Sequence, residues 1–592
     1  MGRFAKATLM GRCRGNEISW SSSKEVFERI RDLSLGFSAL GVGHGERVAL
    51  VSESRPEWLC VDLAVLSAGG VLVPIYPTLS AGQIRYILED SGARIAVVSS
   101  KLQLEKLQEI RHQLPALEAI VAIDAAAPTG SPSLFTLDAI AERGHARMTG
   151  QWGVGREFRD AARGVTPDQL ATIVYTSGTT GEPKGVMLTH GNLTANLYAG
   201  AKALEVRQDD IALSFLPLSH AFERMVAYVY LLCGVTIVFA ESFETIGRDI
   251  AAVKPTVITG VPRVYEKLHD RILEKGQAGS SLKKAMFGWA IGVGRARGQA
   301  VLRGKEPGPL TSMQARVADR LVFTKIRDGL GGRIRYLVSG SAPLSGSMAE
   351  FFYGIGLRVI EGYGLTETAP ILTVNPPEAP RVGTVGKVVE GVELRIAADG
   401  EILARGPNIM TGYYRKPEAT ASVLKDGWFH TGDIGTIDAN GYLTITDRKK
   451  DLLVTSGGKK IAPQPIEEVL KRSPLVNEAV ILGDRRKYVA ALIVPNYKAL
   501  ERRILDLGRP AADLSDPKSR PPLLERDDVL TLYQEVIDAL NRDLSQFERI
   551  KRFVLLPAEF SIETGELTPT LKVKRKVVEE RWKEEIEKLY RE

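Results

Sequence analysis

Nine short apolar runs between residues 47 and 339 constrain the fold of this 592-residue chain more than any other feature of its sequence. The runs are continuous rather than alternating, a pattern typical of strands buried on both faces of a parallel sheet. Segments with helical periodicity separate them, so the sequence predicts an α/β fold with layered subdomains. A first helix is expected after Ser21–Ser23, which offers candidate N-caps. The predicted strands are Arg47–Val51, Val71–Ile75, Arg94–Ser99, Ile120–Ile123, Ala171–Tyr175, Ile211–Phe215, Thr236–Phe239, Thr256–Thr259 and Arg335–Ser339.

The pattern changes after about residue 380. Asp399-Gly400 and Asn440-Gly441 are hairpin-turn signals, because these residue types tolerate positive φ. We therefore expect an antiparallel β-rich, barrel-like section at about 380–447, and then a small α+β domain. The elements expected there are a helix at Ile466–Lys471, strands at Ala479–Gly483 and Val489–Val494, and a loop at 507–527. With a boundary near Lys450, the predicted domains are residues 1–449 and 450–592.

Composition excludes several classes of protein. Hydrophobic residues make up 44% of the chain and charged residues 25%, which is enough apolar surface for a core and argues against global disorder. No apolar run reaches 18 residues, so no membrane span is expected, and the basic start lacks the apolar stretch of a signal peptide. The three cysteines are far apart and fit neither a metal site nor a disulfide framework, which favours a reducing cytosol.

The formal net charge is +7. No nucleic-acid-binding motif accompanies it, and a polyanionic small substrate explains the sign.

The segment Tyr175–Val186 carries the strongest functional signal. Its twelve residues include three glycines, four Ser or Thr hydroxyls and Lys184, directly after a predicted buried strand. A flexible loop in this place can turn successive backbone N–H groups toward a phosphate, while the hydroxyls and the lysine add donors and positive charge. The spacing G-x-x-x-x-G-K-[ST] of the Walker loop does not occur here.

Six further strings follow in order along the chain. Taken singly, each has an ordinary structural interpretation: His220 fits a buried, hydrogen-bonded histidine, and Thr366 fits the N-cap of a helix. Isolated Asp and Arg residues are usually surface charges. The strings are Leu216-Pro-Leu-Ser-His220-Ala-Phe-Glu-Arg224, Ser339-Gly-Ser-Ala-Pro-Leu344, Glu361-Gly-Tyr-Gly-Leu-Thr-Glu-Thr368, Asp426-Gly-Trp-Phe-His-Thr-Gly-Asp433, Asp447-Arg448 and Leu567-Thr-Pro-Thr-Leu-Lys-Val-Lys-Arg-Lys576.

Together and in this order, the strings resemble those of the AMP-forming adenylating enzymes, which include acyl-CoA synthetases, luciferases and carrier-loading adenylation domains. The resemblance spans roughly residues 18–580 and is greatest to the long-chain fatty acyl-CoA synthetase branch. It implies ATP, Mg²⁺ and coenzyme A as cofactor and co-substrates, and a mobile C-terminal lid domain with its hinge near Lys450. Relatives usually carry more sequence before the first helix, so the strand or arm found there is expected to be short or absent.

The resemblance also assigns roles residue by residue. The catalytic candidates are Lys572, Glu367, Thr176 and His220, with Thr176 and Glu367 as Mg²⁺ ligands. The phosphate loop comprises Ser177, Gly178, Thr179, Thr180, Gly181 and Lys184. The adenine pocket comprises Gly340, Ser341 and Ala342, and Tyr363 stacks on adenine. Glu361, Gly362 and Gly364 are further cofactor-binding residues of the same string. Thr366 faces the α-phosphate, Asp433 faces the ribose hydroxyls, and Arg448 holds the ribose or phosphate side. Lys450 is the hinge, and Gly457, Gly458 and Lys459 approach the pantetheine of CoA.

One assignment departs from the family pattern, which has Gly-Lys where this chain has Leu571-Lys572. Lys574 and Lys576 lie close enough in sequence to compete for the role of the adenylation lysine.

The function implied is ATP-dependent activation of a long-chain fatty acid to acyl-AMP, followed by transfer to CoA. Two alternatives stay open: a fatty acyl-AMP ligase that loads an acyl carrier protein, and a non-catalytic protein that binds acyl-adenylate or acyl-CoA. A non-catalytic binding protein would be expected to lack catalytic groups, but Glu367, Asp433, Arg448 and Lys572 are all present in this chain.

Residues 266–330 are helical, basic and amphipathic, and fit a helical insertion, core packing or a face that contacts a membrane surface. A cytoplasmic protein is expected, with peripheral contact at the inner face of the membrane as one interpretation. The sequence is compatible with a monomer or a homodimer, and chain-length preference cannot be counted from it.

Overall fold

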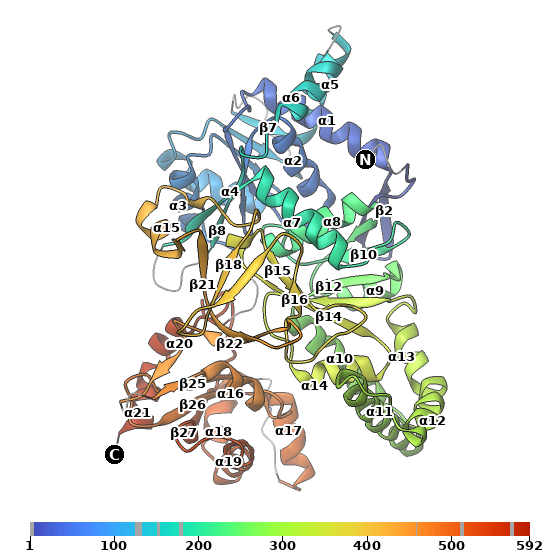
Figure 1. Ribbon diagram of the computed structural model, residues 1–592, viewed down its shortest axis with the longest axis vertical. Helices are drawn as coiled ribbons and strands as arrows, with labels where there is room; N and C mark the ends of the chain where they lie inside the picture. Colours follow the sequence, from blue (N-terminus) through green and yellow to red (C-terminus); the bar gives the residue numbers. More distant parts are fainter. Residues whose placement is uncertain are drawn as a thin grey trace. The chain divides into compact units, whose positions relative to one another are not determined.

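The computed structural model describes residues 5–124, 133–150, 154–176, 182–456, 459–509, 514, 516–568 and 573–591 (Figure 1). The chain forms two compact units. The first comprises Met1–Arg395, Leu403–Thr431 and Asp438–Leu443, and the second comprises Ile396–Ile402, Gly432–Ile437 and Thr444–Glu592. No helix among the described residues combines the length and the apolar character needed to cross a bilayer.

The first sheet of unit 1 has eight strands in the order β19-β9-β8-β4-β3-β5-β6-β7. Pairing is parallel from β8 through to β7, and antiparallel where β9 joins β8 and β19. The strands are β3 (Arg47–Val51), β4 (Val71–Ile75), β5 (Ile95–Val98), β6 (Ala119–Ala122), β7 (Leu134–Thr136), β8 (Leu170–Thr176), β9 (Lys184–Thr189) and β19 (Gly412–Tyr413).

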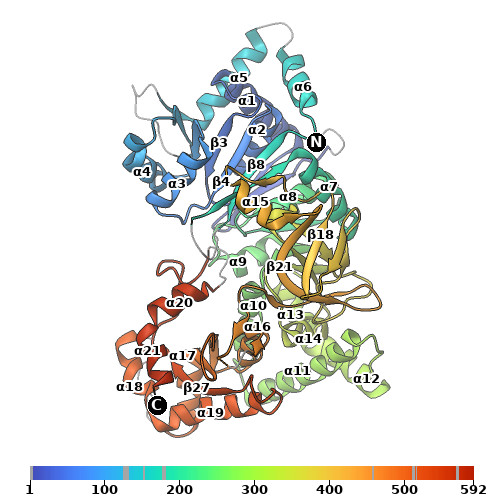
Figure 2. The same ribbon diagram turned by 60° about the vertical axis from the view of Figure 1, so that its left-hand side comes forward.

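Both faces of this sheet are buried, which explains its continuous apolar strands. Val48 and Leu50 lie in the core with α1 (Ser23–Ala39) and α2 (Pro56–Ser67), whereas Ala49 and Val51 lie in the core with α3 (Ala81–Ser91) and α4 (Lys101–Ile110). Figure 2 shows these helices around β3, β4 and β8. The predicted first helix is confirmed: Ser22 caps α1, and Glu25 completes the capping box. The remaining helices here are α5 (Leu137–Gly150) and α6 (Val154–Gly164).

The second sheet of unit 1 has nine strands in the order β16-β15-β14-β13-β12-β10-β11-β1-β2. Its central strands were predicted from apolar runs. The strands are β1 (Met10–Arg14), β2 (Glu17–Ser21), β10 (Ile211–Ser214), β11 (Thr236–Phe239), β12 (Val257–Gly260), β13 (Tyr336–Ser339), β14 (Arg358–Gly364), β15 (Ile371–Val374) and β16 (Lys387–Val388). The helices packed on it are α7 (His190–Ala203), α8 (Ala221–Cys233), α9 (Ile246–Val253), α10 (Pro262–Gly276) and α14 (Gly346–Gly354).

The strand or arm that was expected to be short or absent at the start of the chain is present and short, because each of its two strands has five residues. Residues Met10–Ser21 form a hairpin, and β1 pairs with β11 in parallel register from Met10 opposite Ile237. The outer strand β2 is mostly exposed, so it lacks the apolar run that revealed the other strands.

A buried ion pair joins the two sheets of unit 1. Arg224 of α8 donates to both carboxylate oxygens of Asp62 on α2, at 2.6 and 3.1 Å, and to the hydroxyl of Thr172 on β8 at 2.8 Å. Tyr228 donates to the same carboxylate at 2.5 Å. The side chains of Arg224 and Asp62 are 3% and 0% exposed, so their charges compensate each other out of contact with water.

The predicted β-rich section is a five-stranded sheet in the order β17-β18-β21-β20, with β22 beside β21. Gly400 and Gly441 have φ of +87° and +81°, which confirms the two predicted turns. The strands are β17 (Glu393–Ile396), β18 (Glu401–Arg405), β20 (Leu424–Lys425), β21 (Trp428–Ile437) and β22 (Leu443–Arg448), and the helix α15 (Pro417–Val423) precedes β20.

The remainder of unit 2 is the predicted small α+β fold. Alternate residues of its sheet β25-β26-β27 face two cores, one with α16, α17 and α19 and one with α20 and α21. The elements are β23 (Leu453–Val454), β24 (Lys460–Ile461), α16 (Pro463–Leu470), β25 (Val476–Leu482), β26 (Val489–Pro495), α17 (Tyr497–Asp506), α18 (Arg520–Leu524), α19 (Asp527–Asn541), β27 (Ile550–Leu555), α20 (Arg575–Arg581) and α21 (Lys583–Tyr590). The prediction of a loop throughout 507–527 was wrong, because α18 forms inside it.

Between α10 and β13, unit 1 carries a helical insertion, as the sequence predicted. It comprises α11 (Ser281–Leu302), α12 (Pro309–Ala318), a π-helical turn at Asp319–Phe323 and α13 (Thr324–Gly329).

Candidate active site

The predicted phosphate loop connects the last residue of β8 to the first residue of β9. Thr176 and Lys184 are opposite each other in the β8–β9 register, and the Thr176 hydroxyl lies 3.5 Å from the Lys184 carbonyl oxygen. The next residue, Gly185, has no room for a side chain, because a Cβ would lie 2.6 Å from Ile173. The loop residues Ser177, Gly178, Thr179, Thr180 and Gly181 lie outside the described residues.

Glu367 is held beside this hairpin by a residue that the sequence did not single out. The Tyr413 hydroxyl donates to Glu367 Oε1 at 2.8 Å, and Lys184 Nζ lies 5.1 Å from the centre of the Tyr413 ring. Tyr413 is on β19, which pairs with β9 at Val186. Burial and the Glu367 carboxylate raise the pKa of Tyr413 well above its ordinary value, so the phenol stays protonated and donates. One aromatic ring thus contacts both a predicted metal ligand and a predicted phosphate ligand.

The segment Glu361–Thr368 runs from β14 into a tight turn. At Gly364 a Cβ would lie 1.7 Å from the Pro370 carbonyl oxygen, so only glycine fits. Gly362 and Tyr363 pair with Val374 and Thr373 of β15, and Tyr363 is half-buried against the core.

Thr366 begins a three-residue 3₁₀ turn whose N-cap position is Leu365. The alternative interpretation of Thr366 as a helix N-cap was therefore wrong.

The string Ser339–Leu344 leaves the carboxyl end of β13. Gly340 lies against α8, since a Cβ there would be 2.7 Å from the Phe222 ring. Ser341 has φ of +68°, a strained conformation for a residue with a side chain, and Ala342 follows it. Glu361 Oε1 accepts from the Leu344 backbone N–H at 3.2 Å, which connects this turn to β14.

His220 occupies the N-cap position of α8, where its Nδ1 accepts from the Phe222 backbone N–H at 3.2 Å. The side chain is half-buried, so a structural role for this nitrogen is visible beside the catalytic one expected.

Three residues on, Glu223 is 2% exposed and was not singled out by the sequence. Ser214 donates to Glu223 Oε1 at 2.5 Å, and Oε2 has no partner among the described residues. Burial raises the pKa of Glu223 to about 8, with the Ser214 hydrogen bond acting in the opposite direction.

In unit 2, Asp433 and Arg448 form an ion pair with each other. Arg448 Nε lies 3.1 Å from Asp433 Oδ1, and the Asp433 side chain is only 4% exposed. Asp447, beside them in sequence, accepts from the Arg448 backbone N–H at 2.6 Å, and burial raises the pKa of its carboxyl to about 6. The two residues predicted to face the ribose therefore form one charged pair.

Lys459, one of the residues expected to face pantetheine, directly precedes β24, which pairs with β23. Lys459 carries its ammonium 5.8 Å from the centre of the Phe547 ring, and its backbone N–H donates to the Thr455 hydroxyl at 3.3 Å. Gly457 and Gly458 lie outside the described residues. Lys450, the expected hinge, directly follows Lys449, which bridges Asp399 at 2.7 Å and Glu401 at 2.9 Å.

Lys572 also lies outside the described residues, whereas residues before and after it are described. Leu567 pairs with Val573, and the Lys574 N–H donates to the Glu566 carbonyl oxygen at 2.7 Å. The backbone of Lys574 is thus held beside the Leu567–Val573 bridge, and Lys576 is on α20.

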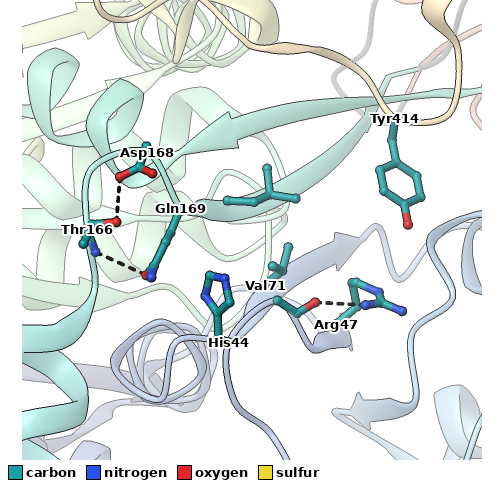
Figure 3. Close-up of a pocket in the computed structure, with 9 residues that line it drawn as sticks. His44, Arg47, Val71, Thr166, Asp168, Gln169 and Tyr414 are labelled. Carbon is teal, nitrogen blue, oxygen red and sulfur yellow. Dashed lines mark hydrogen bonds between the residues drawn. The ribbon is translucent and has the colours of Figure 1, made fainter.

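A pocket of about 390 Å³ lies elsewhere in unit 1, at the first residues of β3, β4 and β8 (Figure 3). Its polar lining includes His44, Arg47, Asp168 and Tyr414. Arg47 already donates to the backbone carbonyls of Gly45, Ser91 and Gly92 at 2.9–3.2 Å. None of the predicted site residues lines this pocket, which opens at the amino ends of the strands, whereas ligands of open α/β sheets bind at the carboxyl ends.

No cluster of three or more His, Cys, Asp or Glu side chains among the described residues could hold a metal ion. Glu367 and Thr176 offer hard oxygen donors, and Mg²⁺ commonly takes one or two protein oxygens together with substrate phosphates and water. The donor set therefore fits a Mg²⁺ ion that arrives with a nucleotide.

Comparisons with known proteins agree with this geometry. Residues 4–414 match the family model of the AMP-binding enzymes, and residues 450–507 and 511–592 match the AMP-binding enzyme C-terminal domain. The long-chain-fatty-acid–CoA ligase FadD15 of Mycobacterium bovis is 38% identical over 96% of this chain and 91% of its own length. The long-chain-fatty-acid–CoA ligase ACSBG2 of Xenopus laevis is 32% identical over 100% of this chain and 82% of its own.

Among solved structures, ATP-bound MatB from Rhodopseudomonas palustris superposes with a TM-score of 0.68 at 25% identity, over 98% of this chain and 96% of its own. The fold predicted from the sequence, a large α/β N-terminal domain followed by a smaller C-terminal domain, is confirmed. The chain belongs to the AMP-binding enzyme family, the adenylate-forming enzymes that its motifs resemble.

Proposed function

We propose that this protein is an ATP-dependent long-chain fatty acid–CoA ligase. It joins a fatty carboxylate to the α-phosphorus of ATP with release of pyrophosphate, and the thiol of CoA then displaces AMP to give acyl-CoA. The observation that carries this proposal is the 38% identity with a long-chain-fatty-acid–CoA ligase over nearly the full length of both chains. The arrangement of Lys184, Tyr413 and Glu367 supports it.

The first half-reaction brings two anions together, so the site must neutralise charge and hold the reactants in line. Lys184 and the loop Thr176–Gly181 hold the phosphates, and Gly340, Ser341, Ala342 and Tyr363 form the adenine site. Thr366 donates to the α-phosphate, and His220 orients the carboxylate at the start of α8. No general base is required, because a carboxylic acid is already ionised near neutral pH.

Glu367 and Thr176 would hold Mg²⁺, which supplies positive charge to the phosphate oxygens when it is bound. The hydrogen bond from Tyr413 leaves Glu367 Oε2 available as a ligand and fixes the carboxylate plane.

In unit 2, Asp433 accepts from the ribose hydroxyls, and its pairing with Arg448 orients its carboxylate. Lys572 is the adenylation lysine. The positions of its two competitors support this choice, because the backbone of Lys574 is hydrogen-bonded to Glu566 and Lys576 is on a helix.

Thioester formation uses a different face of the C-terminal domain, residues 450–592. This domain rotates at Lys450 and presents Gly457, Gly458 and Lys459 to the pantetheine thiol. The glycines let the backbone approach the ligand closely, and a lysine favours the thiolate.

The test is a pair of half-reaction assays with a panel of acids of graded length. Purified protein with ATP, Mg²⁺ and CoA should release acyl-CoA from long-chain acids. Lys572→Ala should lose pyrophosphate exchange but still convert preformed acyl-AMP to acyl-CoA, and Lys450→Pro should impair the second half more than the first.

Three outcomes would contradict the proposal. Release of pyrophosphate without acyl-CoA, with transfer to an acyl carrier protein instead, identifies a carrier-loading ligase. Binding of acyl-AMP or acyl-CoA without pyrophosphate release identifies a non-catalytic binding protein. Normal pyrophosphate exchange in Lys572→Ala refutes the lysine assignment.

We further propose a cytoplasmic protein with peripheral contact at the inner face of the membrane, where long-chain acids partition.

A further inference from the structure

Helix α12 of the insertion turns its apolar stripe toward solvent. Leu310, Met313, Val317 and Leu321 are 64%, 60%, 46% and 41% exposed. Their spacing of three and four residues places them on one face of the helix and the π-helical turn that continues it. The opposite face makes the core contacts, through Ala315, Ala318, Val322 and Phe323. An isolated exposed leucine needs no explanation, but a row of four large apolar side chains does.

The neighbouring helix α11 adds to this apolar surface. Leu282 is 79% exposed and Trp289 is 39% exposed. Helices α11 and α12 contact each other and lie side by side in both views (Figures 1 and 2). The buried face of α11 packs on α14, with Gly298 so close to Glu350 that a Cβ would lie 2.1 Å from its carbonyl oxygen. The insertion is therefore fixed to unit 1 by its inner faces and exposes apolar side chains on its outer ones.

Positive charge is concentrated on the same segment. Residues 281–325, all of them described, contain nine Lys or Arg and two carboxylates, Glu306 and Asp319, which is a net charge of +7. The whole chain also has a net charge of +7, so the remainder of the molecule is electrically balanced. The nine basic residues are Lys283, Lys284, Arg295, Arg297, Arg303, Lys305, Arg316, Arg320 and Lys325.

These basic groups are not used in ion pairs within the described structure. Asp319 pairs with Arg327 at 2.7 Å, and Arg316 and Arg320 have no ion-pair partner among the residues that the structure describes. Both are exposed, next to the apolar stripe in sequence. Positive charge beside exposed leucine, methionine and tryptophan is the combination that binds the interface of a bilayer.

We propose that the outer surface of α11, α12 and the π-helical turn docks this protein on a bilayer that contains anionic phospholipids. The apolar stripe enters the boundary between headgroups and acyl chains, and the basic side chains contact phosphates. Charge complementarity selects this occupant: a second copy of the chain would bring the same +7 segment against its equal, and a nucleic acid would leave the four apolar side chains without a partner.

The inference deepens the proposed peripheral contact by naming its surface, and it can be tested without the ligase activity. The probe is co-sedimentation of the full chain with vesicles of phosphatidylcholine alone and of phosphatidylcholine with about 30% phosphatidylglycerol. Tight binding is expected only to the anionic vesicles, with a fall of at least about tenfold between low and high salt, as expected for surface charges.

Two variants separate the apolar and the charged parts of the surface. Leu310→Ser/Met313→Ser/Val317→Ser and Arg316→Glu/Arg320→Glu should each weaken vesicle binding at least about tenfold. Matched controls change equally exposed groups elsewhere in unit 1: Leu102→Ser/Tyr198→Ser, at 59% and 66% exposure, and Lys24→Glu/Arg163→Glu. The controls should bind as the unchanged protein does. All variants should keep the thermal transition, which shows that the effect is not one of folding.

The fluorescence of Trp289 can report how deeply this surface enters the bilayer. Bromine-labelled acyl chains should quench part of the tryptophan fluorescence, and Trp289→Phe should remove that part although five other tryptophans remain of the six in the chain.

The inference is overturned if both surface variants sediment as the unchanged protein does, if neutral vesicles bind equally well, or if the controls lose as much binding. Loss of a dimer in size-exclusion chromatography, with vesicle binding intact, would assign the stripe to a second copy instead. Vesicle binding by a protein that never releases pyrophosphate would leave this surface standing and refute only the proposed function.

Discussion

Replacing Glu223 with glutamine should change the pH dependence of stability. The side chain is 2% exposed, one of its oxygens lacks a partner among the described residues, and burial raises its pKa to about 8. The folded protein therefore keeps this proton up to about pH 8, whereas the unfolded chain releases it above its ordinary value of 4.5. The folded state binds more protons over this interval, so the stability of the unchanged protein falls as the pH rises from 4.5 toward 8.

The size of the effect follows from the two pKa values. Between pH 5 and pH 8 the difference in proton binding removes about 3 kcal/mol of stability, at about 1.4 kcal/mol per unit. Glutamine has nearly the same shape, accepts from Ser214 and carries no proton to lose. For a cooperative domain of roughly 400 residues, about 3 kcal/mol corresponds to a shift of about 4 °C in Tm.

The measurement is differential scanning calorimetry of both proteins at pH 5.5 and pH 8. The Tm of Glu223→Gln relative to the unchanged protein should be about 4 °C higher at pH 8 than at pH 5.5. Glu89→Gln, which changes an exposed carboxyl on α3, is the matched control and should show no such divergence. The reasoning is refuted if the Tm difference is the same at both pH values, because a pH-independent difference reports packing rather than a displaced proton.

Three further substitutions test the site and its support. Tyr413→Phe removes the hydrogen-bond donor to Glu367. The kcat/KM for pyrophosphate exchange should therefore fall about 10- to 100-fold, in line with about 1.5–3 kcal/mol for a hydrogen bond to a charged group. More Mg²⁺ should also be needed for half-maximal rate, and an unchanged Mg²⁺ dependence would count against this role. Gly364→Ala places a Cβ 1.7 Å from a backbone carbonyl oxygen, so the soluble yield or the Tm should drop sharply, and a protein that melts normally would show that the turn can relax. Asp62→Asn should lower the free energy of unfolding by about 3–5 kcal/mol in urea titrations, because it leaves Arg224 buried without a counter-charge. The double variant Asp62→Leu/Arg224→Met should lower it less. Equal losses in the two variants would mean that the ion pair is not the source of the loss.

The central strands could be predicted because both of their faces are buried. A strand such as β3 contributes alternate residues to two cores, and a continuous apolar run is the only pattern that satisfies both. The same logic explains what was missed. The edge strand β2 is largely exposed, and β27, with the sequence Ile-Lys-Arg-Phe-Val-Leu, is interrupted by charge, so neither has the run that the prediction relied on.

The site could be predicted only where a motif is local. Asp433 and Arg448 belong to recognisable strings, and the structure pairs them at 3.1 Å. Tyr413 is 46 positions from its partner Glu367, and no spacing rule joins them; the contact arises because β19 pairs with β9. Glu223 stood inside a quoted motif, but its importance lies in its burial, which a single sequence does not display.

The bridge formed by Asp62, Arg224 and Thr172 has a consequence for how the large unit can be assembled and dissected. Arg224 lies 162 positions after Asp62 and 52 after Thr172, and all three side chains are buried in the folded unit. A fragment that ends before α8 would leave Asp62 without its counter-charge among apolar side chains, and the complementary fragment would leave Arg224 in the same state. We therefore expect that neither half of unit 1 folds on its own, and that the two halves fold only when they are mixed.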